Sequence, residues 1–343
     1  MRRGVRPRFA TAAAVLGVSV LLGLALGPTG ISVEEVVRVL ISHLPGVDAA
    51  GDVPVSKQNI VWDVRLPRVL LAGLVGGTLA LSGASYQGVF RNPLADPYLI
   101  GVATGGALGA TIVITTGAAW SWHGLSVLPL AAFIGAMASV VIVYAVAGVR
   151  DTVATTSLIL AGVAVASLTT AITSYLMIKN TTSASAVLSV VLGGFNTATW
   201  SELVWVMPYT IIGSAVILAY SRVVNVLALD GEQARFLGVD VDRTNLVLLT
   251  ASSLAAAAAV SVAGVIGFVG LIVPHAIRLI WGPDNRHLMP MCLLLGAAFM
   301  ILADILARTV DAPAEIPVGI ITALCGVPFF LYLLRRSEAG ALW

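Results

Sequence analysis

The stretch PRVLLAGLVGGTLALSGASYQGVF, residues 67–90, decides the class of fold. After Arg68 near its start, it contains no charged side chain. A bilayer crossing needs about 20 consecutive apolar residues, so this stretch predicts a transmembrane helix. The whole chain repeats the pattern: 58% of its 343 residues are apolar and 10% are charged, against about 25% charged in soluble domains. The sequence therefore predicts an all-α polytopic membrane protein.

Apolar windows divide the chain into ten predicted transmembrane helices within a single transmembrane domain, residues 1–343. Residues 186–197 are apolar but too short to cross, which indicates a partial or surface helix. Gly and Ser interrupt the run around residues 245–270 and make its division the hardest. The predicted spans are residues 9–27, 67–90, 97–116, 127–148, 152–178, 200–221, 244–263, 265–281, 288–307 and 316–334.

A secretory signal would look similar to residues 9–27, but this run is near full spanning length, so we expect an uncleaved helix.

Basic residues predict the orientation of these helices. An even number of spans places both termini on one side. A cytoplasmic N-terminus leaves thirteen Arg and Lys residues inside and six outside, as the positive-inside rule requires. The chain is thus expected in the cytoplasmic membrane with both termini in the cytoplasm. The six outer residues are Arg38, Lys57, Arg65, Arg68, Lys179 and Arg308.

The sequence lacks motifs for chemistry of its own. It has no Gly-x-x-x-x-Gly-Lys-Ser/Thr phosphate loop, no His-Glu-x-x-His and no Gly-x-Ser-x-Gly. We therefore expect no enzyme activity, no cofactor and no metal. Asp304 is the one deep acid in a predicted span, and Arg308 lies four residues later, which favours a structural ion pair. A stand-alone secondary carrier or channel remains the alternative to a transporter that takes its energy from another subunit.

Two stretches on the predicted cytoplasmic side could contact such a subunit. Asp230 with Gln233 resembles a capping box, and Gly238 suits the end of a short helix. Such a helix would expose Ala234, Phe236 and Leu237 and form a docking knob, unless it folds back onto its own spans. The second stretch is Gln87–Pro97, where two prolines predict a loop. The residues of the predicted docking knob are Asp230, Gly231, Glu232, Gln233, Ala234, Arg235, Phe236, Leu237 and Gly238.

On the predicted outer side, Ser32 and Glu35 form a capping box that opens an amphipathic run, residues 31–44. Three arginines, Arg65, Arg68 and Arg308, are expected to face outward. Arginine suits bidentate recognition of carboxylates, so an acidic external partner could bind there. Snorkelling anchors explain the same residues equally well.

Together these motifs resemble the iron-siderophore, heme and cobalamin permeases of type II ABC importers. The resemblance runs from about residue 58 to 336 and rests on many short matches in family order. The principal matches are Arg65-Leu-Pro-Arg68, SGASYQGVFRNPLADP at residues 82–97, GVIGFVGLIVPHAIR at residues 264–278, Leu302-Ala-Asp-Ile-Leu-Ala-Arg308 and Glu315-Ile-Pro-Val-Gly319.

The resemblance implies about ten transmembrane helices per subunit and no role for nucleic acid. Its implied partners are two cytoplasmic ABC ATPase subunits, an extracytoplasmic substrate-binding protein, a second permease copy (a homodimer is favoured) and membrane lipid. It makes the outer arginines a docking site for the binding protein and residues 229–243 the coupling loop to the ATPase.

Thr169 and Thr170 match the place of the pathway gate, although a transmembrane Thr commonly bonds its own i−4 carbonyl. His275 matches a family histidine, for which we expect a structural role. The expected substrate is a ferric siderophore or heme, with cobalamin as the alternative.

Overall fold

The computed structural model describes residues 5–45, 47, 49, 51–118, 120–122, 125–148, 155–229 and 231–338, and this part of the chain is nearly all helical. The prediction of an all-α polytopic membrane protein is confirmed. The helices in the predicted spans are α1 (Val5–Ala25), α4 (Leu66–Phe90), α5 (Val102–Thr116), α6 (Val127–Val146), α7 (Thr155–Lys179), α9 (Trp200–Ala219), α12 (Val241–Ala263), α13 (Val269–Trp281), α14 (Asn285–Thr309) and α15 (Val318–Glu338).

Short elements connect these helices. Among the described residues, seven helices are both long and apolar enough to cross a bilayer, and α5, α13 and the part of α15 from Val318 to Tyr332 are shorter apolar helices. The connecting elements are α2 (Val33–Ser42), α3 (Val55–Asn59), the π-helical η1 (Ile60–Arg65), the 3₁₀-helical η2 (Pro97–Ile100) and η3 (Thr181–Ser183), β1 (Ser121–Trp122) paired with β2 (Leu125–Ser126), α8 (Ala184–Leu192), α10 (Ser221–Leu227) and α11 (Gly231–Phe236).

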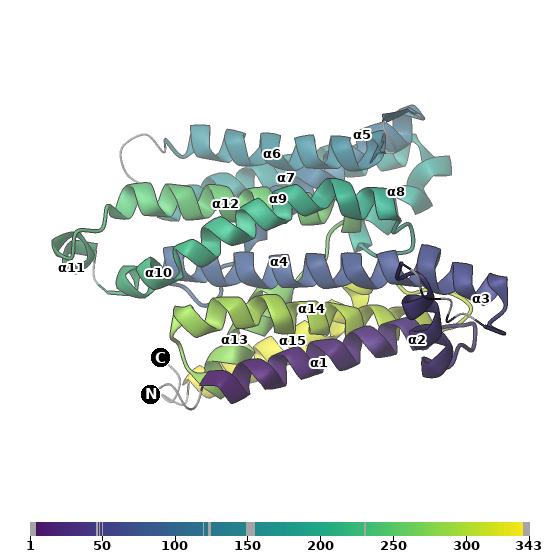
Figure 1. The fold of residues 1–343 in the computed structure, drawn as a ribbon. Coiled ribbons are helices and arrows are strands. Elements are labelled where there is room, and N and C mark those ends of the chain that lie inside the picture. Colours follow the sequence, from purple (N-terminus) through teal and green to yellow (C-terminus); the bar gives the residue numbers. More distant parts are fainter. Residues whose placement is uncertain are drawn as a thin grey trace.

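Helix α4 is the centre of the bundle, with α9, α12, α13 and α14 around it (Figure 1). Its apolar window is 83% buried, the highest share of any candidate span. Small residues permit this packing: a Cβ on Gly83 would lie 2.1 Å from the carbonyl oxygen of Gly270 in α13. Likewise, a Cβ on Gly109 of α5 would lie 2.1 Å from the Ala131 oxygen of α6. These glycines therefore serve close helix packing within the chain, as small residues do in other membrane bundles.

The division between α12 and α13 is a non-helical segment, residues 264–268, in the interior of the bundle. In a bilayer its backbone polar groups need partners within the protein. Two bonds join this region to the end of α8: Val265 N–H donates to Val190 O (3.1 Å), and Gly194 N–H, just beyond α8, donates to Ala263 O of α12 (2.8 Å). The short apolar stretch predicted as a partial helix thus becomes α8, which closes this break.

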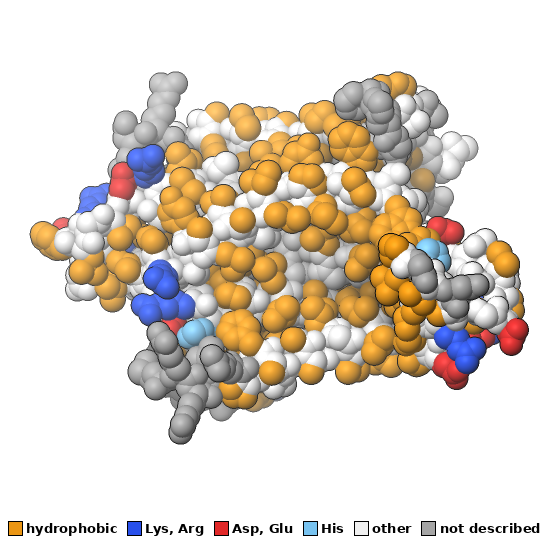
Figure 2. Space-filling view, viewed as in Figure 1, with side chains coloured by type: hydrophobic (Ala, Val, Ile, Leu, Met, Phe, Trp, Pro, Cys, Tyr) orange, Lys and Arg blue, Asp and Glu red, His pale blue; other side chains and the backbone are white. Residues whose placement is uncertain are grey.

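The surface agrees with a bilayer environment. Hydrophobic side chains cover the flank of the bundle, and charged side chains gather at its two ends (Figure 2). The start of α1, the end of α15 and α11 lie at one end, while α2, α3 and the start of α4 lie at the other (Figure 1). We call these the α11 end and the α2 end.

At the α2 end, the predicted capping box of Ser32 and Glu35 is confirmed. The side chain of Lys57 and the backbone of Ser32 hydrogen-bond the Glu35 carboxylate and hold its pKa at about 2, well below its usual value. These contacts tie α2 to α3, because Lys57 Nζ lies 2.7 Å from Glu35 Oε1. The α2 helix is therefore fixed at both its start and its charged face.

Candidate functional site

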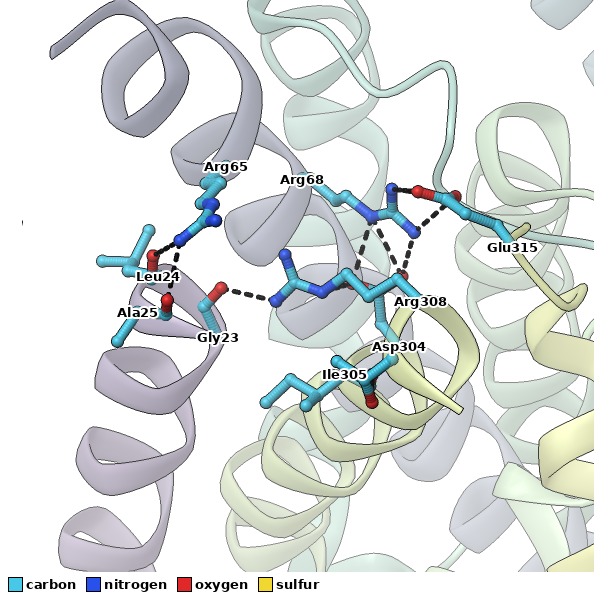
Figure 3. Close-up of polar contacts among 10 residues, drawn as sticks. Gly23, Leu24, Ala25, Arg65, Arg68, Asp304, Ile305, Arg308 and Glu315 are labelled. Atoms are coloured by element: carbon cyan, nitrogen blue, oxygen red, sulfur yellow. Dashed lines mark hydrogen bonds and ion pairs between the residues drawn. The ribbon is translucent and has the colours of Figure 1, made fainter. Parts of the chain in front are cut away.

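Arg68, in the first turn of α4, binds two carboxylates at once (Figure 3). Its Nε and Nη2 donate to Asp304 Oδ1 of α14 at 3.0 and 2.8 Å. Its Nη1 donates to both oxygens of Glu315 at 3.0 and 3.1 Å. Both contacts use the planar fork of the guanidinium, the geometry that makes arginine–carboxylate pairs strong. Arg68 therefore joins α4, α14 and the segment before α15.

Arg308 is the second cation beside Asp304. Its Nε lies 3.6 Å from Asp304 Oδ2, so the ion pair predicted from the i,i+4 spacing is confirmed. Its Nη2 donates to the carbonyl oxygen of Gly23, near the end of α1. The Asp304 side chain is only 1% exposed, and a carboxylate so deeply buried requires such partners.

Arg65, in η1, caps the C-terminal end of α1. Its Nη1 donates to Leu24 O and Ala25 O at 2.7 and 2.8 Å, and its Nη2 donates to Thr29 O at 2.5 Å. The last carbonyls of a helix lack partners within the helix and carry partial negative charge, so a cation is favourable there. Gly27 leaves the necessary space, because a Cβ there would lie 2.8 Å from Arg65 Nη2.

The expectation that these three arginines face outward is wrong. Arg65, Arg68 and Arg308 are 4%, 8% and 3% exposed, because buried carboxylates and helix-end carbonyls bind their guanidinium groups. They are not snorkelling anchors either. We call Arg65, Arg68, Asp304, Arg308 and Glu315 the arginine cluster. Its three cations face two carboxylates, so one positive charge has no acidic counterpart within it.

Glu315 was not singled out as a functional residue from the sequence. It lies 247 residues from Arg68 along the chain, so no local spacing connects them. The sequence contained one indication of its role. Glu315 is an acid directly before the last predicted span, on the predicted outer side where Arg65, Arg68 and Arg308 also lie. Its side chain is 35% exposed, which makes it the accessible acid of the arginine cluster.

At the α11 end, the predicted docking knob is a short helix that projects beyond α10 (Figure 1). Asp230 lies outside the described residues. The helix ends as predicted at Gly238, whose φ is +81°. Val239 N–H donates to Ala234 O (3.1 Å) and Gly238 N–H to Arg235 O (2.9 Å), which is the bonding pattern of a Schellman cap.

The exposure of the knob is only partly as expected. Phe236 and Leu237 are 89% and 64% exposed, but Ala234 is fully buried, so its predicted exposure is wrong. Ala234 lies on the side of the helix that folds back onto the chain. Arg235 Nη2 lies 2.8 Å from Asp242 Oδ2 in the first turn of α12, which fixes α11 against that helix. The knob thus presents two apolar side chains on a tethered helix.

The two threonines of the predicted gate lie on different faces of α7. Thr169 is buried, and its hydroxyl donates to Val165 O at 2.9 Å, the i−4 bond that needs no functional explanation. Thr170 is exposed, on the face that also presents Val163, which is 54% exposed, two turns earlier. Only Thr170 is therefore placed to contact a pathway or a second subunit.

Comparison with known proteins gives a consistent result. The model of the FecCD transport family matches residues 15–336. The cobalamin import system permease protein BtuC of Halobacterium salinarum is 48% identical over 290 residues, covering 84% of this chain and 77% of the relative. The hemin transport system permease protein HmuU of Yersinia pestis is 41% identical over 289 residues, covering 81% of this chain and 84% of the relative.

A solved structure has the same fold. It is described as an inward-facing conformation of a metal-chelate type ABC transporter, and it superposes with a TM-score of 0.82 at 31% sequence identity. The match covers 96% of this chain and 99% of the other. Fold and sequence therefore agree over almost the whole chain, including both ends of the bundle.

Proposed function

Since the chain belongs to the FecCD transport family, we propose that it is the transmembrane permease subunit of an ATP-binding-cassette importer in the cytoplasmic membrane. The observation that carries this proposal is the family match over residues 15–336. In the proposed assembly, two permease copies, a homodimer, enclose one pathway. Two cytoplasmic ATPase subunits drive it, and an extracytoplasmic binding protein supplies the substrate.

We assign the α11 end to the cytoplasm and residues 229–243 to ATPase coupling. The exposed Phe236 and Leu237 support this assignment, because isolated apolar side chains on a projecting helix suit burial in a partner. The salt bridge from Arg235 to Asp242 would pass a displacement of α11 directly to α12. A permease without a nucleotide site needs such a contact, because only a bound partner can shift the equilibrium between its two conformations.

We assign the arginine cluster to docking of the binding protein. Its uncompensated positive charge supports this, since an external carboxylate would complete the charge balance. The 35% exposed Glu315 marks the side on which the arginine cluster meets the solvent. On this proposal, the arginines both stabilise the bundle and attract the partner. Reversal of Arg65 and Arg68 to Glu is expected to weaken docking and remove its salt dependence. Because both side chains also hold the bundle together, this result counts only for variants whose thermal unfolding matches that of the wild type.

The proposed substrate is a ferric siderophore or heme, as the permeases for hemin and ferric citrate among the relatives suggest. Cobalamin is the second candidate, and the 48% identity to the Halobacterium permease favours it specifically. All are bulky metal complexes. Competition of heme, a ferric siderophore and cobalamin for uptake by the assembled transporter would distinguish them.

The test of the proposed function is uptake by proteoliposomes that contain the permease, its ATPase and its binding protein. Import against a gradient should require ATP and should stop when the catalytic site of the ATPase is disabled. Replacement of residues 232–238 by a Gly/Ser linker should abolish stimulated ATP hydrolysis while the bundle stays folded. Uphill import by the permease alone would instead support a secondary carrier.

A further inference from the structure

A second polar feature lies at the α11 end, apart from the docking knob. A cavity of about 500 Å³ opens between the last turn of α4, the turn after it, α10 and the last turn of α13. Among the described residues of its lining none is acidic, whereas two are arginines. We call it the cationic cavity. Its polar lining residues are Gln87, Arg91, Asn92, His275, Arg278 and Asn285.

Arg278, half-buried in this cavity, has a neutral partner. Its Nη1 donates to Gln87 Oε1, and Gln87 Nε2 in turn donates to Gly270 O at 2.9 Å. Within the described part of the chain, no carboxylate lies within ion-pair distance of Arg278. The nearby Asp284 is engaged elsewhere, because its Oδ1 accepts from Asn225 Nδ2 at 2.7 Å and from Arg286 N–H at 3.0 Å. A half-buried cation whose only partner is an amide favours the binding of an anion next to it.

Two further groups point to an occupant of the cavity. Arg91, at the end of α4, is exposed and has a φ of +48°, a conformation in which glycine is the ordinary residue. Because Arg91 and Arg278 both line the cavity, it holds a second cation. His275 Nε2 is buried without a hydrogen-bond partner. The lining therefore offers two positive charges and an unused polar atom.

The position of the cavity favours a protein partner over lipid. One wall is α4, the most buried helix, so the cavity lies at the end of the bundle's core and not on its lipid-facing flank. Another wall is α10, which leads directly to α11 (Figure 1). A subunit that covers Phe236 and Leu237 would therefore lie next to the cavity.

We propose that the cationic cavity receives an acidic side chain of the ATPase subunit, as a second contact beside α11. This inference rests on the proposed function. In the proposed complex, Arg91 attracts the carboxylate of the ATPase at the opening of the cavity. Arg278, which is hydrogen-bonded to Gln87, pairs with this carboxylate inside the cavity. Because Gln87 also bonds Gly270 of α13, the same contact would link the ATPase to α4 and α13, whereas α11 links it to α12.

The test measures the affinity of the purified permease for its ATPase in nanodiscs of uncharged phosphatidylcholine. Arg91→Glu should weaken binding at least about tenfold, and Arg91→Lys should bind nearly as well as the wild type. Arg91→Gly removes the charge and relaxes the backbone, so it should weaken binding without loss of thermal stability. The matched control is Arg222→Glu, on α10 and exposed but outside the cavity lining, which should change binding less than about twofold.

A charge exchange identifies the partner residue. One Asp or Glu on the ATPase, changed to Lys, should restore binding to Arg91→Glu. Three results would overturn the inference. The first is an equal loss of ATPase affinity for Arg91→Glu and Arg222→Glu, and the second is that no position on the ATPase restores binding. The third is a loss of affinity seen only in nanodiscs of anionic phosphatidylglycerol, which would indicate a lipid-headgroup site. If the wild type does not bind the ATPase, the proposed function itself fails; if only α11 variants lose binding, this inference alone fails.

Discussion

At the scale of single residues, the two acids of the arginine cluster differ in burial and should differ in importance. Asp304→Asn leaves Arg68 and Arg308 without their buried counter-charge, so the free energy of unfolding should fall by about 3–5 kcal/mol. Glu315→Gln changes a 35% exposed side chain and should cost about 1 kcal/mol or less. Unfolding of the purified variants in detergent measures both. Equal losses would contradict the assigned roles.

The same residues show what the sequence can predict. The pair of Asp304 and Arg308 could be predicted because a helix brings residues four apart together. The stronger contact of Asp304 with Arg68 could not, because 236 residues separate them. Burial of the arginines was missed for the same reason: their partners are a distant acid and the last carbonyls of another helix, which local patterns do not reveal.

At the scale of elements, α11 depends on Gly238 for its exit into α12. A β-branched residue in the left-handed conformation costs roughly 1–2 kcal/mol, so Gly238→Val should misplace the helix and lower transport-coupled ATP hydrolysis. Gly238→Asn, which tolerates this conformation, should retain most of it. Hydrolysis by the assembled transporter, with and without binding protein, is the measurement. A fully active Gly238→Val variant would refute the dependence on this cap.

Elements with strong local signals were predictable: the capping box of α2 and the glycine end of α11. Helix α12 ends at Ala263, where the predicted span also ends. What satisfies the backbone of the break could not be predicted, because the partners come from α8 and the residues just after it, some 70 residues earlier in the sequence. Ala234 was assigned to the wrong face, since a short helix on a connecting segment has no apolar periodicity long enough to reveal which side packs inward.

At the scale of the whole molecule, the orientation predicts which positions are reachable from each side of the membrane. Cys325 is exposed and should first be changed to Ser, whereas Cys292 is buried. In intact cells that produce the permease without its ATPase, so that Phe236 is not covered, a membrane-impermeant maleimide should label Val55→Cys, which replaces a 69% exposed side chain at the α2 end. It should label Phe236→Cys only after the membrane is opened. The opposite pattern would reverse the assigned orientation.

The backbone contacts between α8 and residues 264–268 limit how the bundle can change shape. In a bilayer, a backbone group that loses its partner is costly, so separation of α8 from the junction of α12 and α13 is disfavoured. A transport cycle is therefore expected to carry these three elements as one rigid body. Rotation would then concentrate in the connections that lack such cross-links.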